Sequence, residues 1–246
     1  MTTRTDEIWK SSPLVERYLE GVRGGIPMAA EQIDVMMWLV SHGGENVTRF
    51  LDMGCGDGVL GAALLAAYPE AKGVFVDFSE PMLAAARQKL SADLDRIELL
   101  QLDFAAPAWV KGVQHAAPYD VIVSGYSLHH QPNERKMAVF AEVRDLLRPG
   151  GIFINVEHVA SRTPWIGLLN DELFIDCLHS AHVSEGGTKS REDVASEYYH
   201  RPDKSANILA PVESQCEWLR GLGYQDVDCY FKVFELAVFG GRRREK

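Results

Sequence analysis

Short apolar, β-branched runs alternate with helical stretches from residue 49 onward, and this alternation restricts the chain to few folds. The runs are RFLDM (49–53), GVFVD (73–77), IELLQL (97–102), DVIVS (120–124) and GIFINVE (151–157). Strands that are apolar along their whole length are typical of a parallel sheet with helices on both faces. The roughly 20–30 residues from one run to the next suit a crossover helix. The pattern therefore predicts an α/β fold with a mostly parallel sheet.

Helical stretches fill the intervals, and the chain ends on a different pattern. Apolar residues recur three and four apart in VLGAALLAAY (59–68), EPMLAAARQKL (80–90) and ERKMAVFAEVRDLL (134–147). Ser79 is expected to cap the second of these helices, and RPGG (148–151) to end the third and lead into the fifth strand. QDVDCYF (225–231) and VFELAVF (233–239) have almost no connection between them. We therefore expect the last two strands to pair as an antiparallel hairpin.

Two segments lie outside this pattern and are expected to cover the carboxyl ends of the strands, where ligands bind in such sheets. Residues 1–45 read as two helices separated by GGIP (24–27), and residues 160–210 are polar and rich in His and Tyr. The expected organisation is a single domain over residues 1–246. It comprises an N-terminal helical cover (1–45), a cofactor-binding core (46–159), a lid insertion (160–210) and a final helix with the hairpin (211–246).

Charge and cysteine usage exclude several classes of protein. The chain has 35 acidic and 25 basic residues and a net charge of −10, which disfavours a protein that mainly binds nucleic-acid backbones. The run RRR (242–244) is interpreted as a solvated tail. No apolar run is long enough for a membrane span, and the first ten residues have no apolar signal core. The four cysteines lie far apart without a CxxC pair, so a reduced, cytoplasmic protein is expected.

The strongest local signal is the glycine-rich segment DMGCGDG (52–58), which follows the first predicted strand. Glycines allow a tight turn and a close approach to a ligand, and the next helix offers its N-terminal amides. The stretch GDGVLG (56–61) also satisfies the GxGxxG pattern of NAD-binding proteins. Asp52 stands just before the first glycine, where it would crowd a pyrophosphate. A carboxylate there favours a ligand with an ammonium or sulfonium group.

Carboxylates also follow the second and third predicted strands. Asp77 comes 25 residues after Asp52, where it can accept hydrogen bonds from both hydroxyls of a ribose. Phe78 can lie against an adenine face, and Asp103 beside Phe104 can accept from the adenine amino group. Each carboxylate alone could be a turn or helix cap. Three at the ends of adjacent strands indicate a cationic nucleoside ligand.

These segments together resemble the motifs of the class I S-adenosylmethionine-dependent methyltransferases. The matching segments are FLDMGCGDG, VFVDFS, LLQLDF, YDVIVSGYSLHH and LLRPGGIFINVE, between residues 48 and 158. The resemblance implies a Rossmann-like seven-stranded sheet of order 3-2-1-4-5-7-6 with strand 7 antiparallel, and S-adenosyl-L-methionine as cofactor. The implied cofactor-binding residues are Asp52, Gly54, Cys55, Gly56, Asp77, Phe78, Asp103, Phe104, Ser124 and Gly125.

A looser resemblance involves SLHHQ, LAPVESQCEWLRGLGY and CYFKVFELAVF. These segments are similar to type 11 and type 12 small-molecule methyltransferases. They are also similar to the branch that includes the tRNA wobble-uridine carboxymethyltransferases. The tRNA branch would need a basic surface, which the acidic composition disfavours.

Methyl transfer from a sulfonium is an in-line displacement that depends on alignment, and a base assists when the nucleophile must lose a proton. The base is expected at the carboxyl end of the fourth or fifth strand. Four residues lie there, namely His129, His130, Glu157 and His158. His129 and Glu157 are preferred, although any of the four could instead pack or cap a helix.

The acceptor-binding candidates lie mainly in the two covers, because Tyr and Arg side chains recognise aromatic or anionic molecules. They are Tyr18, Arg23, Tyr126, Tyr198, Tyr199 and Arg201. His179 and His182 are three residues apart, but no thiol or carboxylate cluster accompanies them, so no metal is expected.

The leading hypothesis is a methyltransferase that acts on an oxygen or nitrogen of a small metabolite. The first alternative is a tRNA wobble-uridine modification enzyme that uses S-adenosylmethionine or its carboxylated form. The second is a non-catalytic, adenosyl-binding partner subunit. NAD-dependent oxidoreduction fits the residues least. The expected partner is a small-molecule acceptor, with no membrane involved.

Overall fold

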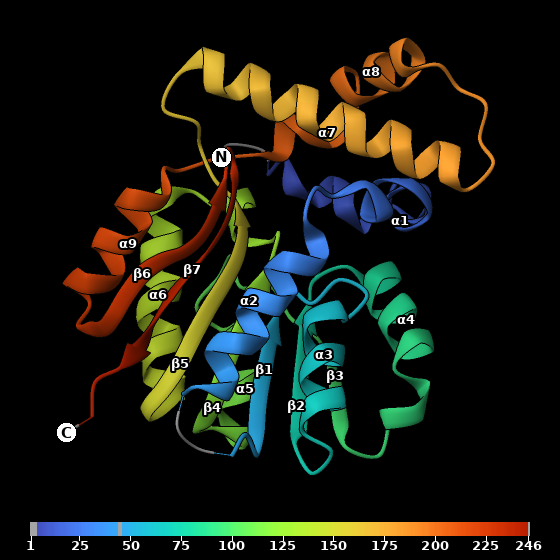
Figure 1. Ribbon diagram of the computed structural model, residues 1–246. Helices are drawn as coiled ribbons and strands as arrows, with labels where there is room; N and C mark the ends of the chain where they lie inside the picture. Colours follow the sequence, from blue (N-terminus) through green and yellow to red (C-terminus); the bar gives the residue numbers. More distant parts are fainter. Residues whose placement is uncertain (1–3, 44–45, 246) are drawn as a thin grey trace.

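The computed structural model describes residues 4–43 and 46–245, and its centre is a seven-stranded sheet (Figure 1). The strand order is β3-β2-β1-β4-β5-β7-β6. All pairs are parallel except those of β7, which runs antiparallel to both β5 and β6. The strands are β1 (Arg49–Met53), β2 (Lys72–Asp77), β3 (Ile97–Gln101), β4 (Tyr119–Gly125), β5 (Leu147–His158), β6 (Tyr224–Val233) and β7 (Leu236–Arg243). The predicted strand order and hairpin are confirmed.

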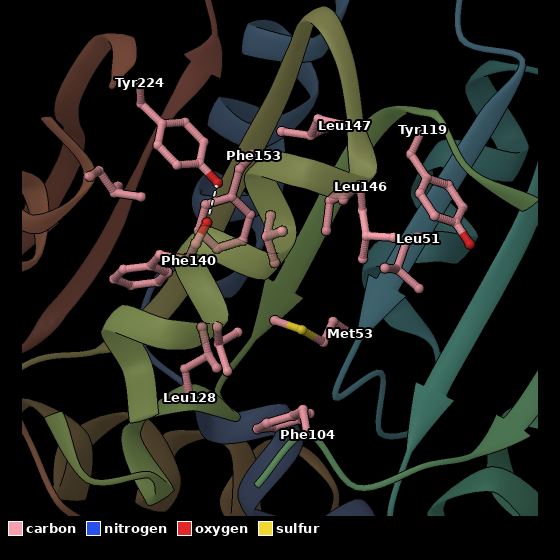
Figure 2. Packing of buried hydrophobic residues seen from close by; sticks show 14 of the residues in the cluster. Leu51, Met53, Phe104, Tyr119, Leu128, Phe140, Leu146, Leu147, Phe153 and Tyr224 are labelled. Atoms are coloured by element: carbon pink, nitrogen blue, oxygen red, sulfur yellow. Dashed lines mark hydrogen bonds between the residues drawn. The ribbon is translucent and has the colours of Figure 1, made fainter. Parts of the chain in front are cut away.

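Helices cover both faces of the sheet, as the continuously apolar strands predict. On one face lie α2 (Ala29–Ser41), α3 (Val59–Ala67) and α4 (Glu80–Lys89). The other face packs against α5 (Trp109–Val113), α6 (Asn133–Leu146) and α9 (Val212–Gly221). Ser79 accepts a hydrogen bond from the Met82 amide and caps α4 as predicted. Figure 2 shows the core beside α6, where Phe140, Phe153 and Tyr224 pack together and the Tyr224 hydroxyl donates to the Phe140 carbonyl at 2.8 Å.

Three boundaries differ from the sequence-based expectations. β5 begins at Leu147, so RPGG (148–151) lies inside the strand as an irregular stretch between the pairs Tyr119↔Leu147 and Val121↔Ile152. The hairpin turns at Phe234–Glu235 and not before Val233, because Phe234 takes the left-handed φ of 49°. Arg242 and Arg243 are part of β7 and donate to the carbonyls of Gly150 and Leu147, so they are not a solvated tail.

Two helical segments lie over the carboxyl ends of the parallel strands (Figure 1). The first contains η1 (Asp6–Lys10), α1 (Ser12–Arg17) and the helical turn η2 (Tyr18–Val22). The second, here termed the α7–α8 cover, is residues 160–210 and contains α7 (Pro164–Ser184), α8 (Arg191–Tyr199) and η7 (Pro202–Ala206). Phe174, Ile175 and Tyr198 pack with Leu236 and seat this cover on the start of β7.

The second N-terminal helix, α2, takes a different place from the one expected. Met36 and Val40 are buried on one side of α2 and pack against Phe50 and Ile154 of the sheet. Only the first turns of α2 reach the strand ends. The N-terminal cover therefore stays a prediction; α1 lies over the strand ends, whereas most of α2 lies on one face of the sheet (Figure 1). No helix within the described ranges is long and apolar enough to span a membrane.

Candidate functional site

The loop between β1 and α3 brings its backbone close to the strand ends because its glycines take left-handed conformations. Gly54, Gly56 and Gly58 have φ values of +65°, +54° and +80°. A Cβ on Gly54 would lie 2.3 Å from the Cβ of Ser127. The amides of Gly54 and Cys55 both donate to the Val76 carbonyl, at 2.7 and 3.0 Å, which fixes the loop against β2. Only glycine, which has no side chain, lets the backbone at position 54 lie this close to Ser127.

Asp52 and Asp77 are both buried, and each accepts backbone hydrogen bonds that hold the loop. The Gly61 amide donates to Asp52 at 2.8 Å. The amides of Gly56 and Ser79 donate to Asp77 at 2.9 and 2.8 Å. Burial raises the pKa of Asp77 to about 6 despite these hydrogen bonds. Both carboxylates therefore have a structural role in the loop, and both also line the cavity described below.

Asp103 is held by the N-terminal segment, which sequence reasoning did not foresee. Its carboxylate accepts from the Ala105 amide at 2.9 Å and pairs with Arg4, which also pairs with the buried Asp6 at 2.7 Å. Burial alone would raise the pKa of Asp103, but the hydrogen bonds from Arg4 and Ala105 hold it below its usual value. The Arg4 guanidinium also lies 5.7 Å from the ring centroid of Phe78. Arg4 thus contacts two residues that were predicted to hold adenine.

A cavity of about 430 Å³ lies at the strand ends, and these groups line it. The predicted cofactor residues that line it are Asp52, Gly54, Cys55, Gly56, Asp77, Phe78, Asp103, Phe104 and Gly125. Ser124 does not reach the cavity. It is fully buried, and its hydroxyl is 2.8 Å from that of Ser127, which lines the cavity instead.

One wall of the cavity contains a buried histidine–glutamate pair. Nδ1 of His129, in η6 (Leu128–His130), lies 2.6 Å from Oε1 of Glu157 on β5. The backbone amides of His129 and His158 also donate to Glu157, at 3.1 and 2.9 Å. Burial lowers the pKa of His129 and raises that of Glu157, although the hydrogen bond from the His158 amide opposes the rise at Glu157. His129 lines the cavity, and Glu157 lies behind it.

Two further histidines complete this wall. Nε2 of His158 lies 2.8 Å from Oε2 of Glu235, and Nδ1 of His130 lies 3.1 Å from the Ala206 carbonyl. The ring centroid of His129 is 4.0 Å from that of His130 and 5.6 Å from that of His158. Burial lowers the pKa of His130 to about 3. Within residues 4–43 and 46–245, no group of three His, Cys, Asp or Glu side chains could hold a metal ion.

The predicted acceptor residues lie in different surroundings, and only some of them line the cavity. Tyr18, Tyr126 and Arg201 line the cavity. Tyr198 is buried beneath Arg201, whose guanidinium lies 4.7 Å from the tyrosine ring centroid, and its hydroxyl donates to Asp171 at 2.7 Å. Tyr199 is 41% exposed and lines no part of this cavity. The Arg23 side chain falls outside the described part of the chain.

A second cavity of about 440 Å³ adjoins the first between α1 and the α7–α8 cover. Trp9, Tyr18 and Arg201 line both cavities. Sequence reasoning missed Trp9, Gln32 and Leu236 as lining residues because they lie in short or apolar segments without a polar motif. Their helical or strand periodicity predicts only burial.

The sheet order, the glycine loop and the strand-end carboxylates together define a Rossmann-like methyltransferase. A family model described as "Methyltransferase domain" matches residues 50–151. A trans-aconitate 2-methyltransferase from Variovorax paradoxus is 30% identical over 72% of this chain and 69% of its own length. The chain belongs to the class I S-adenosyl-L-methionine-dependent methyltransferases, and S-adenosyl-L-methionine is its cofactor.

Other similarities agree with this membership. A carboxy-S-adenosyl-L-methionine synthase from Aeromonas salmonicida is 25% identical over 91% of this chain and 86% of its own length. The structure of human N-acetylserotonin methyltransferase in complex with SAM has a TM-score of 0.62 at 14% identity, over 100% of this chain and 60% of that chain, and shows the shared fold. The chain spans only 28% and 58% of the length of two other methyltransferases that it matches.

Proposed function

We propose that this protein transfers a methyl group from S-adenosyl-L-methionine to an oxygen or nitrogen of a small metabolite, with His129 as general base. The observation that carries the proposal is the buried His129–Glu157 pair, at 2.6 Å, on the wall of the cavity that contains the glycine loop and Asp77.

The cofactor is assigned to the glycine-loop side of the cavity. Asp77 accepts the ribose hydroxyls, while Phe78, Asp103 and Phe104 contact the adenine. The backbone of Gly54–Gly56 contacts the methionine portion. When bound, the cofactor supplies an electrophilic methyl group. The loop fits this ligand because its left-handed glycines expose backbone beside buried carboxylates.

His129 is suited to accept a proton because of how Glu157 holds it. Two backbone amides donate to Glu157, which favours its ionised form, and an ionised carboxylate can only accept hydrogen bonds. Nδ1 of His129 therefore carries the proton, and Nε2 keeps its lone pair. Burial lowers the pKa of His129, so the ring is neutral before the reaction. Such a base contributes about 10²–10⁴-fold to the rate.

The acceptor is assigned to the side of the cavity closed by the α7–α8 cover, which acts as the lid. Arg201 lies there, stacked on Tyr198 and 3.5 Å from Asp203. Tyr18 and Tyr126 complete this part of the wall. A wall with a guanidinium and two tyrosine rings favours an aromatic or anionic acceptor.

A second candidate function is modification of the tRNA wobble uridine with S-adenosylmethionine or its carboxylated form. It is favoured by the similarity to a carboxy-S-adenosyl-L-methionine synthase, which extends over 91% of the chain. The net charge of −10 weighs against the tRNA substrate of that alternative. A binding assay with unfractionated tRNA at low salt distinguishes the candidates, because a tRNA-modifying enzyme would bind it and a small-molecule enzyme would not.

The direct test combines binding and turnover. Isothermal titration calorimetry with S-adenosylhomocysteine should give a micromolar Kd. Radiolabelled S-adenosylmethionine should then transfer its methyl group to at least one member of a panel of hydroxylated and aminated metabolites. Absence of heat with the product would contradict the proposal. Binding without transfer to any panel member would favour a non-catalytic adenosyl-binding subunit.

Cofactor affinity should fall in mildly acidic solution. The ribose hydroxyls need an ionised Asp77, and burial raises the pKa of this carboxyl to about 6. At about pH 5 only roughly a tenth of the groups are ionised, so the Kd of S-adenosylhomocysteine should rise about tenfold relative to pH 7.5. Calorimetry across this range checks the prediction. The Asp77→Asn variant should lose this pH dependence, and a wild-type affinity that is flat down to pH 5 would contradict it.

A further inference from the structure

A second histidine–carboxylate pair lies beside the first and has the same arrangement. His158 is the last residue of β5, and Glu235 lies in the turn between β6 and β7. Their Nε2 and Oε2 atoms are 2.8 Å apart, and the side chains are only 13% and 14% exposed. His158 lines the cavity, whereas Glu235 lies behind it. The cavity wall thus contains two imidazoles, each backed by its own carboxylate.

Glu235 is fixed from several directions. It accepts from the Ser161 hydroxyl and, at 3.3 Å, from the Asn170 side-chain amide. Its own backbone amide donates to Asn170 at 3.4 Å. Burial alone would raise the pKa of Glu235, but the hydrogen bonds from His158 and Ser161 lower it. The carboxylate is therefore ionised at neutral pH and accepts the Nε2 proton of His158.

This arrangement determines the hydrogen-bonding character of the wall. His129 gives its Nδ1 proton to Glu157, and His158 gives its Nε2 proton to Glu235. Within the described residues, neither of the two remaining nitrogens has a protein partner. His130 uses its Nδ1 proton for the Ala206 carbonyl and adds no donor here. The three histidine rings therefore keep hydrogen-bond acceptors and no free N–H donor of their own.

Two acceptors on rings 5.6 Å apart match a ligand that presents two neighbouring donors. A carboxylate or a ketone has no proton to donate and does not match. An ammonium group at this wall would face two imidazoles and no carboxylate, because Glu157 and Glu235 lie behind the wall and are already bonded to the histidines. A pair of adjacent hydroxyl groups meets both requirements without introducing a charge.

We propose that the acceptor carries two adjacent hydroxyl groups and that His158, positioned by Glu235, holds the hydroxyl that is not methylated. This inference rests on the proposed function, in which His129 faces the hydroxyl that receives the methyl group. His158 is then a substrate-binding residue, and Glu235 is a positioning residue.

Calorimetry with catechol and phenol tests the inference on protein saturated with S-adenosylhomocysteine. Wild-type protein should bind catechol about tenfold more tightly than phenol, since one additional satisfied hydrogen bond has this effect. In Glu235→Leu the ratio should fall to about twofold or less, because His158 loses the partner that orients it. Glu235→Gln keeps an acceptor for the Nε2 proton and should retain part of the preference.

The matched control is Glu213→Leu, which removes an exposed glutamate paired with Arg162 at 3.0 Å and should leave the ratio unchanged. Nitrogen-15 NMR of histidine-labelled protein should show His158 protonated at Nε2 in the wild type and a mixture of tautomers in Glu235→Leu. If Glu235→Leu does not fold, His158→Phe should abolish the preference in its place.

Equal affinity of the wild-type protein for catechol and phenol would overturn the inference. Absence of binding heat with both compounds would overturn it as well. So would a preference that survives in Glu235→Leu or His158→Phe. Binding of S-adenosylhomocysteine is measured first. An incorrect cofactor assignment is therefore distinguished from an incorrect role of the His158–Glu235 pair.

Discussion

Asp77→Asn is expected to weaken binding of S-adenosylhomocysteine by about 100-fold or more. The carboxylate accepts from Gly56 and Ser79, and we assign the ribose hydroxyls to it as well. Asparagine has nearly the same shape, but it carries no charge, and its NH2 group replaces an acceptor oxygen with a donor. Hydrogen bonds to a charged group contribute about 1.5–3 kcal/mol each, so losing two of them at the ribose accounts for the expected change.

Calorimetry with S-adenosylhomocysteine measures the effect, and a thermal unfolding scan tests whether the variant remains folded. Asp95→Asn is the matched control, since Asp95 is exposed and lies outside the cavity. A Kd for Asp77→Asn within about threefold of the wild-type value, in a folded protein, would show that Asp77 is only a cap for the loop.

His129→Gln is expected to lower the rate of methyl transfer by about 10²–10⁴-fold while leaving S-adenosylhomocysteine affinity nearly unchanged. Glutamine can still donate to Glu157, so the buried carboxylate keeps a partner and the fold is preserved. It cannot take a proton from the acceptor. Removal of the base therefore affects kcat and spares cofactor binding.

The rate is measured as S-adenosylhomocysteine formed with an acceptor identified in the metabolite panel. His115→Gln is the matched control because His115 also pairs with a glutamate, Glu98 at 3.0 Å, but both side chains are about half exposed on the surface. An equal loss of rate in both variants, or a loss explained by weaker cofactor binding, would argue against a general base at His129.

Most of the sheet and the cofactor side of the site follow from local sequence. Continuous apolar strands predict a buried parallel sheet, and a residue that follows such a strand must lie at its carboxyl end. This reasoning places Asp52, Asp77 and Asp103 at one cavity without knowledge of any tertiary contact. The glycine loop is predicted equally well, because φ values above zero are a local requirement that glycine meets.

The partners of these residues could not be predicted, because they depend on contacts between distant segments. His129 and Glu157 were separate candidates, and their pairing depends on how η6 packs beside β5. Arg4 reaches Asp103 across 99 positions from a segment without a motif. Glu235 reads as part of a strand in VFELAVF, and only the position of the hairpin turn places its carboxylate behind His158.

The turn at Glu235 has a consequence for the evolution and redesign of this enzyme. One carboxylate joins the start of the α7–α8 cover, through Ser161 and Asn170, to a histidine of the reaction cavity. Exchanging the cover for that of a related enzyme would therefore disturb His158 unless the hairpin were transplanted with it. Segments 160–170 and 234–236 are therefore structurally coupled, although more than 60 residues separate them in the chain. An exchange that carries both segments together should preserve the position of His158.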